Sequence, residues 1–246
     1  MNQPTTTEVP SFTLETTVGA IVAARPALAR IFEKLGIDYC CGGKRPLAEL
    51  VRARGLDPAT VLAMLEAATS ALAAGTAEVD AAAMTLTQLA DHIEQSHHDY
   101  VKAELPRLVE MADRVARKHA WRDERLKEIA ETVTLLANEM FSHMAKEETI
   151  LFPFVRQLEA GAPDAFHCGS IANPIRQMED EHEFAGRAVA RLRELTGGFR
   201  PDADACNTHR ALLGGLEEFE GDLHRHVHKE NNILFPRALA FATSRN

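Results

Sequence analysis

The chain has 246 residues, of which 46% are hydrophobic and 26% are charged, and its formal net charge is −9 at pH 7. This composition is typical of a globular protein, and the negative charge argues against a nucleic-acid-binding protein, which would carry a basic stripe. The N-terminus lacks the basic and apolar segments of a secretory signal, and no run of about eighteen apolar residues is present. We therefore expect a cytoplasmic protein that does not cross a membrane.

The four cysteines are too few for a disulfide framework in a chain of this length. We interpret them as free thiols, metal ligands or redox groups in a reducing compartment. Cys168 and Cys206 lie near predicted loops and are interpreted as incidental. The eleven histidines are more informative, because many of them fall inside helical patterns.

The N-terminal part of the chain predicts an arm, a small domain and a linker. Residues 1–13 are polar and rich in Thr and Pro, which predicts a flexible arm. Residues 14–73 predict a domain of short helices, because capping and stop signals follow one another closely; Thr17 can cap the first helix. The sequence IDYCCGGK predicts a turn within this domain. Residues 74–85 are mostly small and offer little to bury, so we interpret them as a linker.

The remainder, residues 86–240, predicts four long helices joined by short connections. Ala, Leu, Glu and Arg dominate, and no segment shows a convincing strand pattern. Short connections between long helices favour an antiparallel four-helix bundle. The predicted fold class is all-α, with a small N-terminal helical domain followed by this bundle. The predicted helices span residues 87–118, 123–159, 171–196 and 204–240.

The pattern H-x-x-x-E-x-x-I-L-F-P occurs twice, as HMAKEETILFP and as HVHKENNILFP. Residues four apart lie on one face of a helix, so His143 with Glu147, and His226 with Glu230, each direct two donor groups the same way. A single such pair is more often a solvated surface pair. A second copy in the same register, followed by the same apolar residues, instead indicates a functional site.

Each motif also follows another helical histidine, which suggests two helical hairpins related by a pseudo-twofold axis. His98 precedes His143 by 45 residues, and His182 precedes His226 by 44. Charged groups near a bundle core are costly unless they are paired or bound to metal. We therefore predict a metal site made of His98, His143, Glu147, His182, His226 and Glu230.

The predicted donor set suits iron. Four imidazoles, two carboxylates that each bridge two metals, and a bridging oxide would leave about one open position on each of two six-coordinate ions. Manganese is the alternative, whereas zinc prefers a closed four-coordinate site. We expect two non-haem iron ions bridged by carboxylates and an oxide.

The motifs DYCCGGK, SHMAKEETILFP and HKENNILFPRA together resemble the repair-of-iron-centres family, of the ScdA/YtfE type, whose bundle is a hemerythrin-like di-iron domain. The resemblance covers residues 10–240. It matches His143 and Glu147 to the SHMxKEE motif, and His226 and Glu230 to the H-x-x-x-E-N-N motif. It also matches the E-H pair at His182 and the H-D pair at His98.

The resemblance implies a stress-response protein involved in repairing iron–sulfur clusters damaged by nitrosative or oxidative stress, with nitric oxide reduced to nitrous oxide at the di-iron site. The implied partners are nitric oxide or another small diatomic, and damaged iron–sulfur proteins. Whether the protein is an enzyme stays open, because a non-enzymatic iron donor and an oxygen or redox sensor are alternatives. Monomer and homodimer are both compatible with the sequence.

One ligand position has two candidates. His97 lies four residues from both Ile93 and Val101, so periodicity alone slightly favours His97 as the inward residue. The H-D match favours His98, which we adopt.

Four further residues are candidates for catalytic or transfer roles. In the family, carboxylates at the positions of Glu139 and Glu181 are candidates for proton delivery or iron passage; each could instead orient a histidine N–H. The family match implies a redox, nitric-oxide or iron-transfer role for Cys40 and Cys41. The alternative is a packed turn in which one thiol is buried.

Overall fold

The computed structural model describes residues 12–72, 80–161 and 170–244. Most of the predicted arm, part of the predicted linker and Cys168 lie outside these residues. The chain forms two compact units, Met1–Ala82 and Ala83–Asn246. The boundary between them falls inside the segment interpreted as a linker.

The first unit consists of short helices with local start and stop signals. The Thr17 side chain accepts a hydrogen bond from the backbone N–H of Ala20, as expected of an N-cap. Gly36 ends a helix with φ +64°, a conformation that glycine adopts without the steric cost of a Cβ. Phe32 and Tyr39 are fully buried in its core. The helices are α1 (Val18–Ala24), η1 (Pro26–Leu28), α2 (Ala29–Leu35), α3 (Leu47–Ala53) and α4 (Pro58–Leu72).

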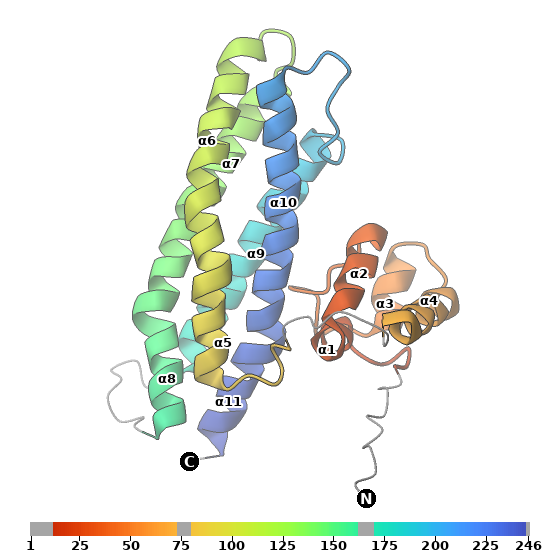
Figure 1. The fold of residues 1–246 in the computed structure, drawn as a ribbon, viewed down its shortest axis with the longest axis vertical. Helices are drawn as coiled ribbons and strands as arrows, with labels where there is room; N and C mark the ends of the chain where they lie inside the picture. The colour runs from red at the N-terminus through yellow and green to blue at the C-terminus, as the bar shows by residue number, and fades with distance from the viewer. Residues whose placement is uncertain (1–11, 73–79, 162–169, 245–246) are drawn as a thin grey trace, which may run out of the picture. The chain divides into compact units, whose positions relative to one another are not determined.

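The second unit is a bundle of four long helical rods (Figure 1). Within the bundle α6 packs against α7 and α10, and α7 also packs against α9. The rods are α5 (Leu86–Ile93) continued by α6 (Asp99–His119), α7 (Arg125–Lys146) continued by α8 (Phe152–Ala160), α9 (Ala172–Leu195), and α10 (Asn207–Lys229) continued by α11 (Phe235–Thr243). The predicted all-α fold, with an N-terminal helical domain and a helical bundle, is confirmed, and no strand occurs among the described residues.

Specific contacts between residues of different rods allow neighbouring rods to pack closely. Glu159 on α8 accepts hydrogen bonds from the backbone N–H groups of Leu86 and Thr87, two free donors at the start of α5. A Cβ on Gly215 of α10 would lie 2.7 Å from Leu108 on α6, so glycine allows these two helices to approach closely. No helix in the described residues is long and apolar enough to span a membrane.

Three of the four rods contain a π-helical turn, which the sequence analysis did not predict. The turns are η2 (Glu94–His98), η3 (Glu147–Leu151) and η5 (Glu230–Leu234). In each turn a backbone N–H donates to the carbonyl five residues back, for example from Phe152 to Glu147. A π-helical turn inserts one extra residue into an α-helix and occurs often at functional sites.

The prolines of the two I-L-F-P motifs lie two residues after the ends of η3 and η5. Pro153 and Pro236 each lie in the first turn of the next helix, where a missing N–H costs least. The motifs differ in their isoleucines, since Ile233 is buried and Ile150 is 46% exposed. The apolar residues that follow the two motifs are therefore not equally buried, because Ile150 belongs to a π-helical turn that departs from α-helical periodicity.

Candidate metal centre

The six predicted ligand residues converge inside the bundle, and all are buried. His98 lies in η2, His143 on α7, His182 on α9 and His226 on α10, while Glu147 and Glu230 are the first residues of η3 and η5. Each of the four rods therefore contributes at least one residue to the cluster.

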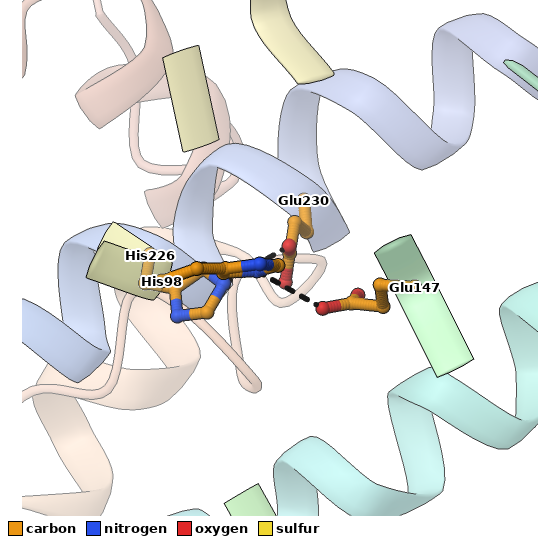
Figure 2. A group of neighbouring side chains, drawn as sticks. All are labelled: His98, Glu147, His226 and Glu230. Carbon is orange, nitrogen blue, oxygen red and sulfur yellow. Dashed lines mark hydrogen bonds and ion pairs between the residues drawn. The ribbon is translucent and has the colours of Figure 1, made fainter. Parts of the chain in front are cut away.

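The donor atoms form two groups, each compact enough to hold a metal ion. One group contains His98, Glu147, His226 and Glu230 (Figure 2), and the other contains His143, Glu147, His182 and Glu230. Both glutamates belong to both groups. Two carboxylates shared in this way are the arrangement that a bridged pair of metal ions requires.

The distances between donor atoms fit ligands around a metal ion. Oε2 of Glu147 lies 3.3 Å from Nε2 of His98 and 3.2 Å from Nε2 of His143. The Glu230 carboxylate lies 3.0 Å from Nε2 of His182 and 3.1 Å from Nε2 of His226. Two ligands at right angles, each about 2.1 Å from one ion, would lie about 3.0 Å apart.

Three of the four histidines are oriented by a hydrogen bond at Nδ1. The partner is Glu148 for His98 (2.7 Å), Glu181 for His143 (2.9 Å) and Asn231 Oδ1 for His182 (2.8 Å). These oxygens accept, so each Nδ1 carries the ring proton and each Nε2 is left to face the centre.

The two phenylalanines of the I-L-F-P motifs stack against the faces of two of these imidazole rings. The ring of Phe152 stacks on His98 with centroids 5.6 Å apart, and the ring of Phe235 stacks on His182 with centroids 6.0 Å apart. The repeated motif thus supplies a stacking ring for the histidine of another rod.

Several buried polar atoms in the cluster lack a hydrogen bond in the described residues. They are both carboxylate oxygens of Glu147, Oε2 of Glu230 and Nε2 of His98. Nε2 of His143 and Nε2 of His182 lie only 3.1 Å apart. Lone pairs directed at one another in this way are repulsive unless extra protons or cations lie among them. The residues present therefore fit a metal pair.

The pKa values of His143 and Glu181 also reflect the concentration of charged groups in this cluster. Burial lowers the pKa of His143, but Glu147, Glu181 and Glu230 outweigh it and raise that pKa to about 10. Burial raises the pKa of Glu181, but hydrogen bonds from His143, Lys146 and Gln177 bring it down to about 2. Protons and metal ions therefore compete for the cluster, and binding a metal releases protons.

His97 and His98 are both buried but have different surroundings. His98 belongs to a metal-competent group, whereas His97 does not. Nδ1 of His97 lies 2.9 Å from Asp222 Oδ1, and its Nε2 accepts a hydrogen bond from Lys229 at 2.7 Å. The geometry thus favours His98 as the ligand and gives His97 separate partners.

The two auxiliary carboxylates also differ. Glu181 is partly buried and bonded to both His143 and Lys146, the orienting role that we considered as its alternative. Glu139 is exposed on α7 and belongs to neither metal-competent group. A role in proton delivery stays a prediction for both residues.

The N-terminal unit carries its own cluster of thiols. Cys40 is buried, whereas Cys41 is partly exposed, and together with Asp38 they form a third group that could hold a metal ion. Both carboxylate oxygens of Asp38 accept backbone hydrogen bonds, from Cys40 and Gly42. A hydrogen bond with Cys41 and burial together raise the pKa of Cys40 well above its usual value, so Cys40 is a protonated thiol. The burial of Cys40 agrees with the alternative of a packed turn in which one thiol is buried.

Comparison with known proteins agrees with both units. Residues 89–238 match the family model described as "Hemerythrin HHE cation binding domain". The chain belongs to the hemerythrin HHE family. Residues 14–69 match a second model, described as a domain of unknown function (DUF542) and named ScdA_N.

The full-length resemblance is equally clear. The chain is 39% identical over 226 residues to the iron-sulfur cluster repair protein YtfE of Musicola paradisiaca, covering 92% of this chain and 96% of the relative. It is 38% identical over 224 residues to the protein of the same name from Enterobacter sp. (strain 638), covering 91% and 96%. The corresponding protein of Escherichia coli O81 is 37% identical over the same shares. The resemblance to the repair-of-iron-centres family is confirmed.

Proposed function

We propose that Glu147 and Glu230 bridge two iron ions, one bound by His98 and His226 and the other by His143 and His182. The observation that carries this proposal is that both carboxylates belong to both metal-competent groups. The hemerythrin HHE description supports a cation at this site. Imidazole and carboxylate donors with open positions suit iron better than a closed zinc site.

We further infer that the protein takes part in the repair of damaged iron–sulfur clusters, the role for which its relatives are named. The associated reaction is the reduction of two nitric oxide molecules to nitrous oxide and water, which consumes two electrons and two protons. Two ferrous ions at the centre would supply both electrons and hold the two nitrogen atoms close together. Glu181, which is ionised and partly exposed beside His143, is suited to carry protons toward the centre.

Anaerobic single-turnover experiments test this reaction. The protein loaded with two ferrous ions should form about one nitrous oxide per metal pair, and so about one for every two nitric oxide molecules consumed, measured in the headspace. Iron analysis and Mössbauer spectroscopy of the same sample test the metal pair separately. A protein that holds two irons but forms no nitrous oxide would exclude the reductase function and leave the metal centre standing.

Iron donation is the second candidate, and the charge of the site favours it. Two ferrous ions would carry four positive charges, whereas the six proposed ligands supply only two carboxylates, so the protein alone would not fully neutralise the bound ions. Incubation with an apo iron–sulfur protein, followed by the absorbance of the rebuilt cluster, distinguishes donation from gas formation. Reversible oxygen binding by the reduced protein would instead support an oxygen or redox sensor.

The thiols of the N-terminal unit fit either role in a reducing compartment such as the cytoplasm. The described cysteines, Cys40, Cys41 and Cys206, form no disulfide. Cys41 is the more accessible member of the adjacent pair and is the better candidate for iron or nitric-oxide transfer. Its replacement by serine should slow transfer to an apo protein without changing the iron content of the bundle.

A further inference from the structure

His226 differs from the other three histidines of the cluster. His98, His143 and His182 each donate from Nδ1 to a side-chain oxygen. Nδ1 of His226 is buried and has no hydrogen-bond partner among the described residues. A metal-binding histidine normally has its ring orientation fixed through this second nitrogen. Another contact must therefore hold the His226 ring.

The imidazole of His97 supplies such a contact. The two rings are parallel within 1°, and their centroids lie 5.2 Å apart. Offset-stacked aromatic rings contribute a specific attraction beyond the area that they bury. Phe152 on His98 and Phe235 on His182 are stacked in the same general way, with centroids 5.6 Å and 6.0 Å apart.

The His97 ring is itself fixed at both nitrogens. Nδ1 is bonded to Asp222 on α10, and Nε2 is bonded to Lys229 at the end of the same helix. Lys229 also donates to Nε2 of His92 on α5, at 2.9 Å. The network therefore joins the first rod to the fourth on the His226 side of the cluster, and His97 is only 4% exposed.

We propose that His97 is a positioning residue for His226, and that its anchored ring replaces the Nδ1 hydrogen bond that orients the other three histidines. This inference rests on the proposed metal pair. It predicts that the two metal positions are unequal. The position of His98 and His226 has one histidine with no acceptor behind it, whereas both histidines of the other position have an oxygen at Nδ1.

Two substitutions at one position separate stacking from hydrogen bonding. His97→Phe keeps a flat ring against His226 but removes both polar anchors, whereas His97→Leu removes the ring. The probe is ferrous iron, titrated anaerobically against a competing chelator, with Mössbauer spectra of the loaded proteins. His97→Leu should weaken the binding of one of two iron equivalents by about tenfold or more, and alter one of two spectral components. His97→Phe should stay within a few-fold of the wild type.

Matched variants keep the test decisive. His92→Phe removes one partner of Lys229 but leaves the stack, and should bind both equivalents as the wild type does. Lys229→Met removes one anchor of His97 but leaves the stack, so it should stay within a few-fold of the wild type, as His97→Phe does. If His97→Leu does not fold, His97→Met removes the ring with a longer apolar side chain and carries the test. Wild-type binding by His97→Leu, or equal weakening in the folded His97→Phe and His97→Leu proteins, would overturn the proposal. If the wild type itself binds fewer than two irons, the proposed metal pair fails first, and with it the role of His97.

Discussion

Glu181 lies at the boundary between the buried cluster and the surface, where it accepts hydrogen bonds from His143 and Lys146. We expect Glu181→Gln to keep an acceptor near His143 but remove the negative charge that makes the imidazole a stronger ligand. Metal affinity should fall about tenfold, the low end of the effect of such partners. Competition with a chelator measures this.

Glu139→Gln provides the contrasting variant. Glu139 is exposed, so iron binding should be unchanged. If Glu139 does deliver protons, the rate of nitrous oxide formation should fall while the iron content stays constant. Equal losses of affinity in both variants would contradict the distinction drawn between these two carboxylates.

His143 contributes strongly to the pH dependence of the metal-free protein near neutrality, and His98, whose pKa nearby carboxylates raise despite its burial, acts in the same direction. The folded-state pKa of His143, about 10, lies above the ordinary value of 6.5, so its contribution to stability is complete below pH 6.5 and is lost as the pH rises toward 10. Burial lowers the pKa of Lys229 to about 8, which opposes this loss above pH 8. His143 alone should therefore lower the free energy of unfolding by up to about 2 kcal/mol between pH 6.5 and 8, and His98 adds a loss of the same sign, as measured by urea titration.

The iron-loaded protein provides the control for this pH effect. A metal ion holds Nε2 of His143 without a proton, so the loss of stability over the same interval should disappear. A metal-free protein of constant stability from pH 6.5 to 8 would show that His143 is not protonated in the folded state.

At the scale of single residues, the six converging side chains could be predicted from the sequence. Each repeated His–Glu pair, four residues apart on a helix, must place both side chains on the same helix face. The sequence did not identify Glu148 or Asn231 as Nδ1 partners. These residues directly follow Glu147 and Glu230, and their contacts reach across to other rods. The only available signal was the polar residue after each glutamate, and the side-by-side packing of the rods cannot be read from that.

Among the secondary-structure elements, the π-helical turns have the most directly testable effect on stability and on iron binding. Deleting Ile150, one of the exposed residues of η3, should restore α-helical hydrogen bonding through that segment. Pro153 would then interrupt a regular helix, at a cost of about 3 kcal/mol. Glu147 would also leave its position in the cluster. Denaturation and iron binding together measure both effects.

A double variant separates these two effects. Adding Pro153→Ala to the deletion should recover most of the lost stability but not the lost iron binding. Recovery of both would mean that the π-helical turn accommodates the proline and does not position Glu147.

The bounds of the four rods could be predicted from the helical spacing of apolar residues and from the glycines between the helices. The predicted bounds agree with the observed bounds to within a few residues. The π-helical turns could not be predicted in this way, since one extra residue barely disturbs a hydrophobic pattern averaged over four turns. Pro153 and Pro236 inside otherwise continuous helical patterns were the available signal. A proline at such a place indicates a departure from regular helix, but not that the departure is a wider turn before it.

At the scale of the whole molecule, the division into two compact units makes the bundle separable. A fragment of residues 83–246 should unfold cooperatively and bind two irons as the full chain does, because all six predicted ligands lie within it. Circular dichroism and iron analysis check this. A fragment that folds but binds no iron would show that the N-terminal unit contributes to the centre.

The full chain and this fragment should differ in iron transfer, because the fragment lacks Cys40 and Cys41. A fragment that donates iron to an apo protein as fast as the full chain would exclude a transfer role for these thiols. The comparison therefore assigns the activity to one unit or to both.

Burial of the cluster within all four rods has a consequence for how metal is acquired. Helical bundles rich in local contacts fold rapidly, so we expect the six polar groups to become enclosed before a metal ion binds. Loading must then wait for a local opening of the rods, whose frequency is set by the protein and not by the metal. In stopped-flow mixing, the rate of iron uptake should level off at high iron concentration. The bundle that retains iron would thus also act as the kinetic barrier to its entry.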